Sequence, residues 1–134
     1  MRKGTYLLFL TFGGPRKTGV GSLGQLEICA GEYCYVGSAM NGMDGRIRRH
    51  FSKDKKMHWH IDRLTVSADV MEAYVPLTHI EECTLSAIAE GCGCIPVFKG
   101  FGCSDCACAT HIFFVTEGSK QKLTAAAGAR PFLL

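Results

Sequence analysis

The chain has 134 residues, of which 47% are hydrophobic and 20% are charged, and its formal net charge is +3. This length and composition are typical of one globular domain that can bury a core without disulfides or metal ions. No apolar run approaches the roughly 18–20 residues of a membrane-spanning helix. The apolar run at 6–10 is short and no small-residue cleavage site follows it, which favours a buried strand over a signal peptide.

The first half of the chain is expected to alternate strands and loops before its first helix. Residues 4–12 are rich in aromatic and other β-compatible side chains and are followed by a Gly-Gly-Pro sequence, which indicates a strand. A flexible, glycine-rich basic loop is expected over 13–25, with a short extra strand at 26–28. The second main strand is expected over 32–38, and a helix over 43–51.

The predicted helix has two distinct faces. Its apolar residues recur every four positions and form a buried stripe, which consists of Met43, Ile47 and Phe51. A second face is formed by residues spaced i, i+3 and i+4, namely Arg46, Arg49 and His50. Basic side chains are therefore expected to cluster on one side of this helix.

The second half of the chain contains the remaining elements. They are expected in this order: a helical segment at 59–64, a strand at 70–77, a helix that opens with a capping box at Thr78 and ends at Gly91, and a strand at 111–115. Residues 118–134 are expected to form a loosely packed tail. The order of elements predicts a single mixed α+β domain over residues 1–134.

A basic stretch follows the predicted helix, interrupted by a single acid, Asp54. Such a stretch is typical either of a solvated face or of a phosphate-binding surface. His58 and His60 would share a face on a strand and could then bind one metal, but on the expected helix they diverge, so one of them is expected to cap or line a DNA-binding cleft. The candidate nucleic-acid-binding residues are Arg49, Lys53, Lys55, Lys56, His58 and His60.

Eight cysteines are present. Without a secretory segment they indicate reduced thiols in a cytoplasmic protein. Five of them and one histidine crowd the segment from Cys92 to His111, which offers more soft ligands than the four of a structural zinc site. The C-x-C spacings differ from the usual paired zinc knuckles. Two interpretations of this segment therefore stay open: a zinc site, or free reduced thiols. The candidate ligands are Cys103, Cys106, Cys108 and His111.

Two short triplets, Gly4-Thr5-Tyr6 and Tyr35-Val36-Gly37, precede the arginine-bearing helix. This arrangement resembles the GIY-YIG nuclease superfamily, and most closely a small, mostly archaeal branch of Uri-superfamily endonucleases. The segments that carry the resemblance are 31–39, 58–62, Glu82-Cys83 and 100–106, and residues 104–111 reproduce the Ser-Asp-Cys-x-Cys-x-x-His ending of that branch. The ordered set is far more specific than either triplet alone.

The resemblance implies a small central, mainly antiparallel sheet flanked by helices. It also implies metal-dependent hydrolysis of DNA phosphodiesters, with Mg²⁺ or Mn²⁺ as cofactor, in repair, recombination or defence, with DNA and DNA-repair proteins as partners. Tyr6 and Tyr35 match the motif tyrosines, Arg46 the helix arginine, and Glu82 the metal-binding glutamate. Thr5 departs from the usual isoleucine or valine. The late asparagine of many members has no clear match, and Ser104 and Asp105 lie nearest to its place.

The chemistry of these residue types suits phosphodiester hydrolysis. Glu82 could hold a hard cation, and Arg46 could compensate the charge of the transition state. A tyrosine with an ordinary pKa of about 10 is a poor base, so Tyr6 or Tyr35 is expected to orient the water. His50 is the alternative base or leaving-group acid because histidine titrates near neutral pH. Two other functions stay open: an inactive nucleic-acid-binding module, and a zinc or thiol protein that uses the Cys92–His111 segment.

Overall fold

The computed structural model describes residues 4–39, 41–103, 106 and 108–133. Within these residues, six strands form one antiparallel sheet in the order β6-β7-β4-β1-β5-β8. Their bounds are β1 Gly4–Phe12, β4 Gly31–Ala39, β5 Val70–Pro76, β6 Ile95–Pro96, β7 Ile112–Phe114 and β8 Ala129–Pro131. A separate hairpin consists of β2 Arg16–Gly19 and β3 Gln25–Ile28, with the short 3₁₀ helix η1 Gly21–Leu23 between them.

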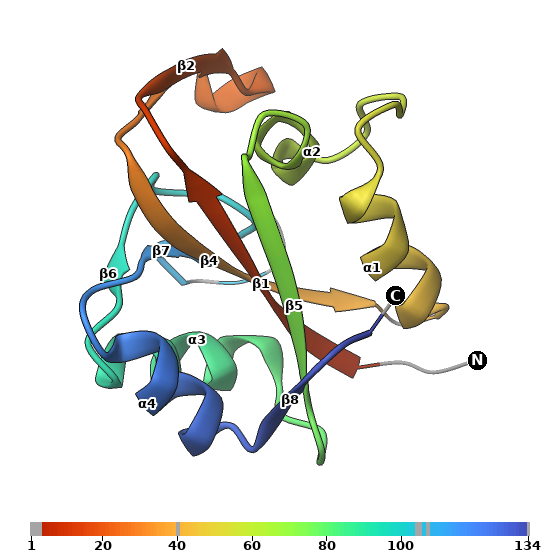
Figure 1. Cartoon of the computed structure of the whole chain (residues 1–134), viewed down its shortest axis with the longest axis vertical. Helices are drawn as coiled ribbons and strands as arrows, with labels where there is room; N and C mark the ends of the chain where they lie inside the picture. The colour runs from red at the N-terminus through yellow and green to blue at the C-terminus, as the bar shows by residue number, and fades with distance from the viewer. Residues whose placement is uncertain (1–3, 40, 104–105, 107, 134) are drawn as a thin grey trace.

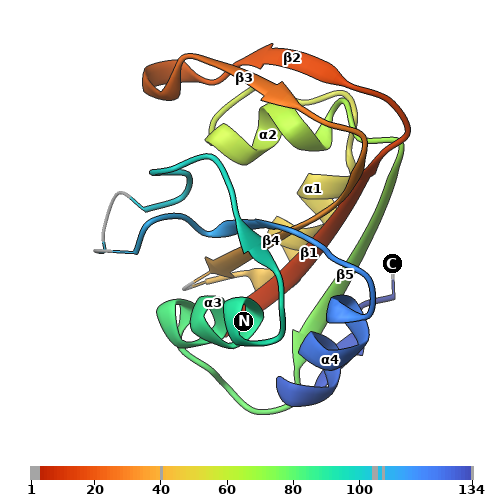
Figure 2. The same cartoon turned by 90° about the vertical axis from the view of Figure 1, so that its left-hand side faces the viewer.

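Helices cover both faces of the sheet. They are α1 Met43–Phe51, α2 His60–Thr65, α3 Glu82–Gly91 and α4 Ser119–Ala126. The first two lie on one face and the last two on the other (Figures 1 and 2). None of the helices in the described part of the chain is long and apolar enough to cross a membrane. The mixed α+β class and the central antiparallel sheet flanked by helices, both expected from the sequence, are confirmed.

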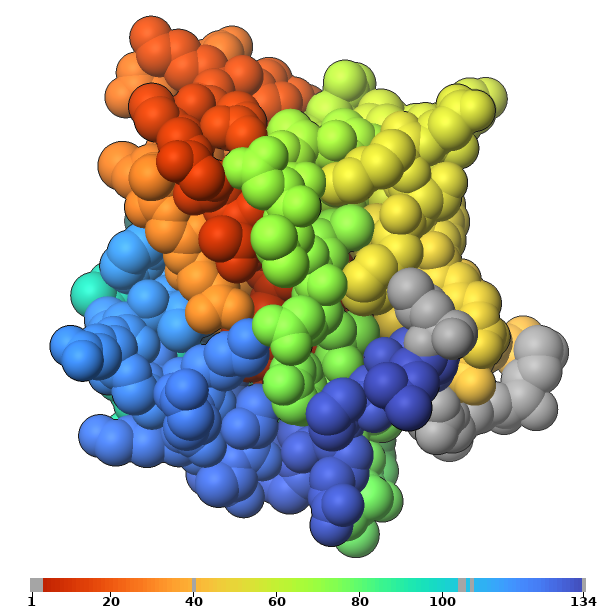
Figure 3. Space-filling model, in the orientation of Figure 1, coloured from red at the N-terminus to blue at the C-terminus, as the bar shows by residue number. Residues whose placement is uncertain are grey.

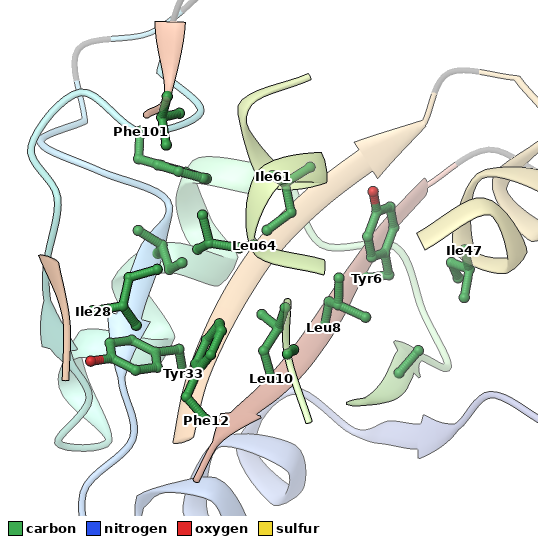
Figure 4. Close-up of a cluster of buried hydrophobic side chains, with 14 of the residues drawn as sticks. Tyr6, Leu8, Leu10, Phe12, Ile28, Tyr33, Ile47, Ile61, Leu64 and Phe101 are labelled. Carbon is green, nitrogen blue, oxygen red and sulfur yellow. The ribbon is translucent and has the colours of Figure 1, made fainter. Parts of the chain in front are cut away.

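The central strand β1 is buried on both faces because its alternating side chains enter two different cores. Tyr6, Leu8 and Leu10 join the core under α1 and α2, which also contains Ile47 from α1 (Figure 4). Leu7 and its neighbours on the opposite face pack against α3 and α4. A strand between two helical layers therefore reads as a continuous apolar run in the sequence.

The segment expected to be a flexible loop at 13–25 is instead largely ordered, and this expectation was wrong. It contains β2 and η1, and β2 pairs with β3, which begins at Gln25. The short strand expected at 26–28 is confirmed within β3. Val20 and Ile28 from this hairpin are buried in the core under α1 and α2, and their burial holds the hairpin in place. The high glycine content of the segment masks these two apolar anchors in the sequence.

Helix α3 begins later than the sequence predicts. The capping box at Thr78 does not form, and Glu81, with an extended ψ of 148°, precedes the first helical residue, Glu82. The hydroxyl of Thr5 in β1 donates to the carbonyl oxygen of Ile80 at 2.8 Å. Because this carbonyl is tied to the sheet, the chain stays extended until Glu81. The expected end at Gly91 is confirmed.

The C-terminal segment is packed, not loose as expected. It forms α4 and β8, and β8 pairs with β5 at the edge of the sheet. Leu123 and Ala127, one helical turn apart, are buried in the core under α3 and α4. Beyond β8 the described chain continues along β5, and the backbone amide of Phe132 donates to the carbonyl of Ala73. Figure 3 shows this segment between β5 and α1, and the guanidinium carbon of Arg48 in α1 lies 5.5 Å from the centre of the Phe132 ring. The extent of the single domain stays a prediction.

Burial of Leu123 predicts a large stability effect in this segment. Leu123→Ala should lower the free energy of unfolding by about 2–5 kcal/mol, because the side chain is fully buried and its removal leaves a cavity. Leu133→Ala, at a side chain that is 83% exposed, is the matched control and should change stability by less than about 0.5 kcal/mol. Urea denaturation measures both; equal effects would contradict the packing of α4.

Candidate active site and cysteine–histidine group

The candidate site is organised around Ser38, near the end of β4. The carbonyl oxygen of Ser38 accepts a hydrogen bond from Nη1 of Arg46 in α1 at 2.7 Å. Its hydroxyl donates to Oε2 of Glu82, the first residue of α3, at 2.5 Å. Since α1 and α3 lie on opposite faces of the sheet (Figure 2), Ser38 joins the predicted arginine and the predicted glutamate across the strand. The sequence analysis assigned Ser38 no role.

A buried tyrosine–histidine pair lies beside this junction. The Tyr6 hydroxyl and Nε2 of His50 are 2.7 Å apart. The ring of Tyr6 lies on Gly37, where a Cβ atom would overlap it, so this position on β4 needs glycine. Tyr35 packs edge-on against His50 and is half-buried. The structure thus brings together all five predicted catalytic residues: Tyr6, Tyr35, Arg46, His50 and Glu82.

The two tyrosines stay protonated at neutral pH. Burial and the neighbouring Tyr35 raise the pKa of Tyr6, although the Arg46 guanidinium opposes the rise. Burial, followed by the charge of Glu82, raises the pKa of Tyr35. Both phenols therefore keep their protons and are poor bases at neutral pH; that they orient a water stays a prediction.

His50 differs from the expectation that it titrates near neutral pH. Burial, with the nearby charge of Lys55, lowers the pKa of His50 to about 4. The ring is therefore neutral at pH 7. A neutral ring can accept a hydrogen bond or act as a base, but it cannot act as the charged acid that protonates the leaving group. A neutral imidazole carries one ring hydrogen, and its position sets which of the Tyr6 hydroxyl and Nε2 donates in this bond. Among the described residues, Nδ1 of His50 is a buried side-chain atom without a hydrogen-bond partner.

Trp59 fixes the arginine face of α1. The guanidinium carbons of Arg46 and Arg49 lie 4.5 and 4.7 Å from the centre of a Trp59 ring. Arg49 also forms a two-pronged contact with the buried carboxylate of Asp62, at 2.7 and 3.0 Å. Burial would raise the pKa of Asp62, but hydrogen bonds from Arg49 and from the amides of Trp59 and His58 lower it to about 2.

Several predicted nucleic-acid-binding residues use their donors inside the protein. Arg49 is paired with Asp62, as described above. Lys53 donates to backbone carbonyls of residues 65 and 68. Lys55 donates to the carbonyls of Arg49 and His50 at the end of α1, and burial lowers the pKa of Lys55 to about 8. These cations stabilise helix ends, where carbonyl oxygens lack partners.

The other three predicted nucleic-acid-binding residues lie nearer to solvent. Lys56 and His58 are exposed, and His60, the first residue of α2, is half-buried against Phe101. The helical interpretation of this segment is confirmed. His58 and His60 are not part of a metal-binding group among the described residues.

A cysteine–histidine group lies next to the candidate active site. Ligand atoms of Cys83, Cys106, Cys108 and His111 all lie within 4.8 Å of one another, and this group could bind a metal such as zinc. The predicted set is corrected at one position, because Cys103 is not in the group; its thiol donates to the carbonyl of Phe101 at 3.3 Å. Cys83 is 20 residues or more from the other ligands, so spacing gave no signal for it. Ser104 and Asp105 lie outside the described residues.

His111 connects the two sites. Its Nε2 lies 3.1 Å from Oε1 of Glu82 and 3.2 Å from the sulfur of Cys106. Its other ring nitrogen, Nδ1, is 2.6 Å from the hydroxyl of Ser86 in α3. The imidazole is thus fixed on one side and shared between a carboxylate and a thiol on the other.

The chain belongs to the family described as domain of unknown function DUF123, which matches residues 5–130. The match includes β1 from its second residue, every later strand up to β7, and both groups of side chains described above. Comparison with curated proteins and with solved structures gave no significant match.

The buried histidine predicts a pH-dependent stability. The unfolded chain binds a proton at His50 with a pKa near 6.5, whereas the folded protein does so only at about 4. Stability is therefore complete above pH 6.5 and is lost as pH falls towards 4, by up to about 3 kcal/mol. Asp62, with its pKa lowered to about 2, contributes mainly below that window.

Denaturant unfolding at several pH values measures this effect. His50→Gln should flatten the loss of stability between pH 6.5 and pH 4, while the control His79→Gln, at an exposed histidine, should keep the slope of the unchanged protein. The same slope in His50→Gln would show that His50 is not held neutral.

Proposed function

We propose that this protein is a metal-dependent nuclease of the GIY-YIG type that hydrolyses phosphodiester bonds of DNA. One observation carries the proposal: Tyr6, Tyr35, Arg46 and Glu82 come from four different elements and meet around the end of β4. They occur in the chain in the order of the GIY-YIG motif residues. Ser38, which contacts both Arg46 and Glu82, holds the arginine and the carboxylate in one site.

The donor set suits a hard divalent cation. Mg²⁺ is commonly held by one or two carboxylates, with waters and substrate phosphates completing its shell. Glu82 supplies one carboxylate, and 29% of its side chain is exposed, so waters and a phosphate could reach it. When bound, the cation would polarise a phosphoryl oxygen and lower the pKa of an attached water.

Arg46 is the charge-compensating residue of the proposed site. Its guanidinium is held by the Ser38 carbonyl and by the Trp59 ring, so its orientation is set before substrate binds. An arginine is always charged and presents several N–H donors in a fixed plane. A preorganised donor of this kind typically contributes about two to three powers of ten in rate.

The tyrosines act as neutral hydrogen-bonding groups. Tyr35 is half-buried, and we assign to its hydroxyl the contact with a phosphate or with the attacking water. Tyr6 is buried and shares a hydrogen bond with Nε2 of His50, and the Arg46 guanidinium lies close enough to its oxygen to oppose the rise in its pKa that burial causes. His50, neutral at pH 7, is the group in this pair that can receive a proton.

The proposed DNA-binding surface is smaller than the basic sequence suggests. Arg49, Lys53 and Lys55 have internal partners. The exposed Lys56 and His58 both precede Trp59 in the sequence, and Trp59 stacks on the arginines of α1. These residues, with Arg46, are the candidates for phosphate contacts outside the reacting group.

The proposal is tested by relaxation of supercoiled plasmid with Mg²⁺ or Mn²⁺. The unchanged protein should nick DNA, and Glu82→Ala and Arg46→Ala should each lower the rate by about 10²-fold or more. Glu90→Ala and Arg130→Ala remove the same side-chain types at exposed positions away from the site and should keep full activity. A thermal melt of each variant separates loss of chemistry from loss of fold.

Two results would contradict the nuclease. The first is a protein that cleaves neither supercoiled, single-stranded nor branched DNA but binds DNA in a salt-sensitive way. This result would identify a nucleic-acid-binding module without turnover. The bonding of both Glu82 oxygens, to Ser38 and to His111, is the observation that favours this second function. Cleavage that survives both Glu82→Ala and Arg46→Ala would place the activity elsewhere.

A further inference from the structure

The segment before β7 has little apolar packing of its own. Phe101 and Thr110 are buried, but none of the described residues between them is. Its ends are tied by backbone hydrogen bonds, from Gly100 to the carbonyl of Ala109 and from His111 to that of Phe101. A segment that buries so little needs another source of order. Cys106 and Cys108 of the cysteine–histidine group lie within it, His111 follows it, and Cys83 lies in α3.

The four ligand atoms are close to tetrahedral zinc spacing. With Zn–S bonds of about 2.3 Å, sulfur ligands lie about 3.8 Å apart. Ligand atoms of Cys83, Cys106, Cys108 and His111 are already within 4.8 Å of one another. A side-chain movement of about 1 Å would therefore close the group around an ion of this size.

The supporting contact of His111 is the kind that metal-bound histidines make. Nδ1 is held by the Ser86 hydroxyl at 2.6 Å, and Ser86 is buried in α3. A partner on one ring nitrogen fixes the ring and directs the other nitrogen to the metal. Nε2 points at the sulfur of Cys106, so it is the nitrogen available as a ligand.

We propose that Cys83, Cys106, Cys108 and Nε2 of His111 form a zinc site that ties the segment before β7 to the start of α3, and that zinc controls the availability of Glu82. Each thiol releases its proton to solvent when its sulfur coordinates zinc. The control follows from Nε2, which lies 3.1 Å from Oε1 of Glu82. Nε2 can donate to the carboxylate only while it carries the ring hydrogen. Coordination uses the lone pair of Nε2, so the ring hydrogen moves to Nδ1, where it donates to the Ser86 hydroxyl.

Zinc binding therefore ends the contact between His111 and Glu82 and leaves Oε1 free to bind a second, hard cation. Ser38 still holds Oε2, so the carboxylate keeps its place. Glu82 and Cys83 are consecutive at the start of α3, so one helix end serves both sites. The control of Glu82 rests on the proposed nuclease function; the zinc site itself does not.

Metal analysis of the full chain, purified without chelator, tests the site. We expect about one zinc per unchanged chain, and less than a tenth of that in Cys83→Ser and Cys106→Ser, because three remaining ligands bind weakly. Cys103→Ser, next to the group, and Cys29→Ser, at an exposed cysteine, should keep their zinc. Less than a tenth of an equivalent in the unchanged protein, or zinc that depends on Cys103 and not on Cys83, would overturn the site.

Cobalt gives a readout that does not depend on a variant folding. Replacing zinc by Co²⁺ in the unchanged chain should produce the strong visible absorption of a tetrahedral site with thiolate ligands. The weak spectrum of six-coordinate Co²⁺ would overturn the proposed ligand set. So would alkylation of the native protein that finds two of these cysteines joined in a disulfide.

Binding of Mn²⁺ tests the control of Glu82 separately from catalysis. Stripping zinc should weaken Mn²⁺ binding about tenfold, because the His111 contact returns to the carboxylate. Glu82→Gln should abolish the difference between the two forms. Equal Mn²⁺ affinity with and without zinc would refute the control. If the unchanged protein has the expected zinc content and Mn²⁺ binding but no nuclease activity, the proposed function is refuted and this inference stands.

Discussion

Tyr6 lies on Gly37 because β1 and β4 pair in a register that places these two residues opposite each other. The same register buries Tyr6 under α1, where it reaches His50, and brings Ser38 to the point where the two helical layers meet. A slip of one residue would move every side chain of β1 to the other face. The whole candidate site therefore depends on this one strand pairing, which both apolar cores hold in place.

A second constraint acts at the start of α3. The Thr5 hydroxyl ties the carbonyl of Ile80 to β1, so the helix begins at Glu82 and not earlier. This start places Glu82 against Ser38 and its neighbour Cys83 in the cysteine–histidine group. The two candidate sites are thus adjacent because they share one helix end, and His111 contacts both.

The sequence predicted the bounds of helices and strands well where the apolar periodicity and the glycine and proline residues that end an element agree. β1 has the expected bounds because its apolar run ends at Gly13-Gly14-Pro15, and α1 has them because its buried stripe repeats every four residues. Prediction failed where one buried residue decides the outcome. Leu123 anchors α4 within a polar and alanine-rich segment, and no periodic pattern reveals it.

The sequence alone determined the fold class, the main strands, and the order of Tyr6, Tyr35, Arg46 and Glu82 along the chain, since these depend on local patterning and motif order. Only the tertiary structure decided which charges are engaged, because the partners of Lys53 and Lys55 are backbone carbonyls whose positions depend on packing. It also decided that Cys83 replaces Cys103 beside His111. Ligands that come together from distant segments leave no spacing in the sequence, since the fold, and not the chain, sets their separation.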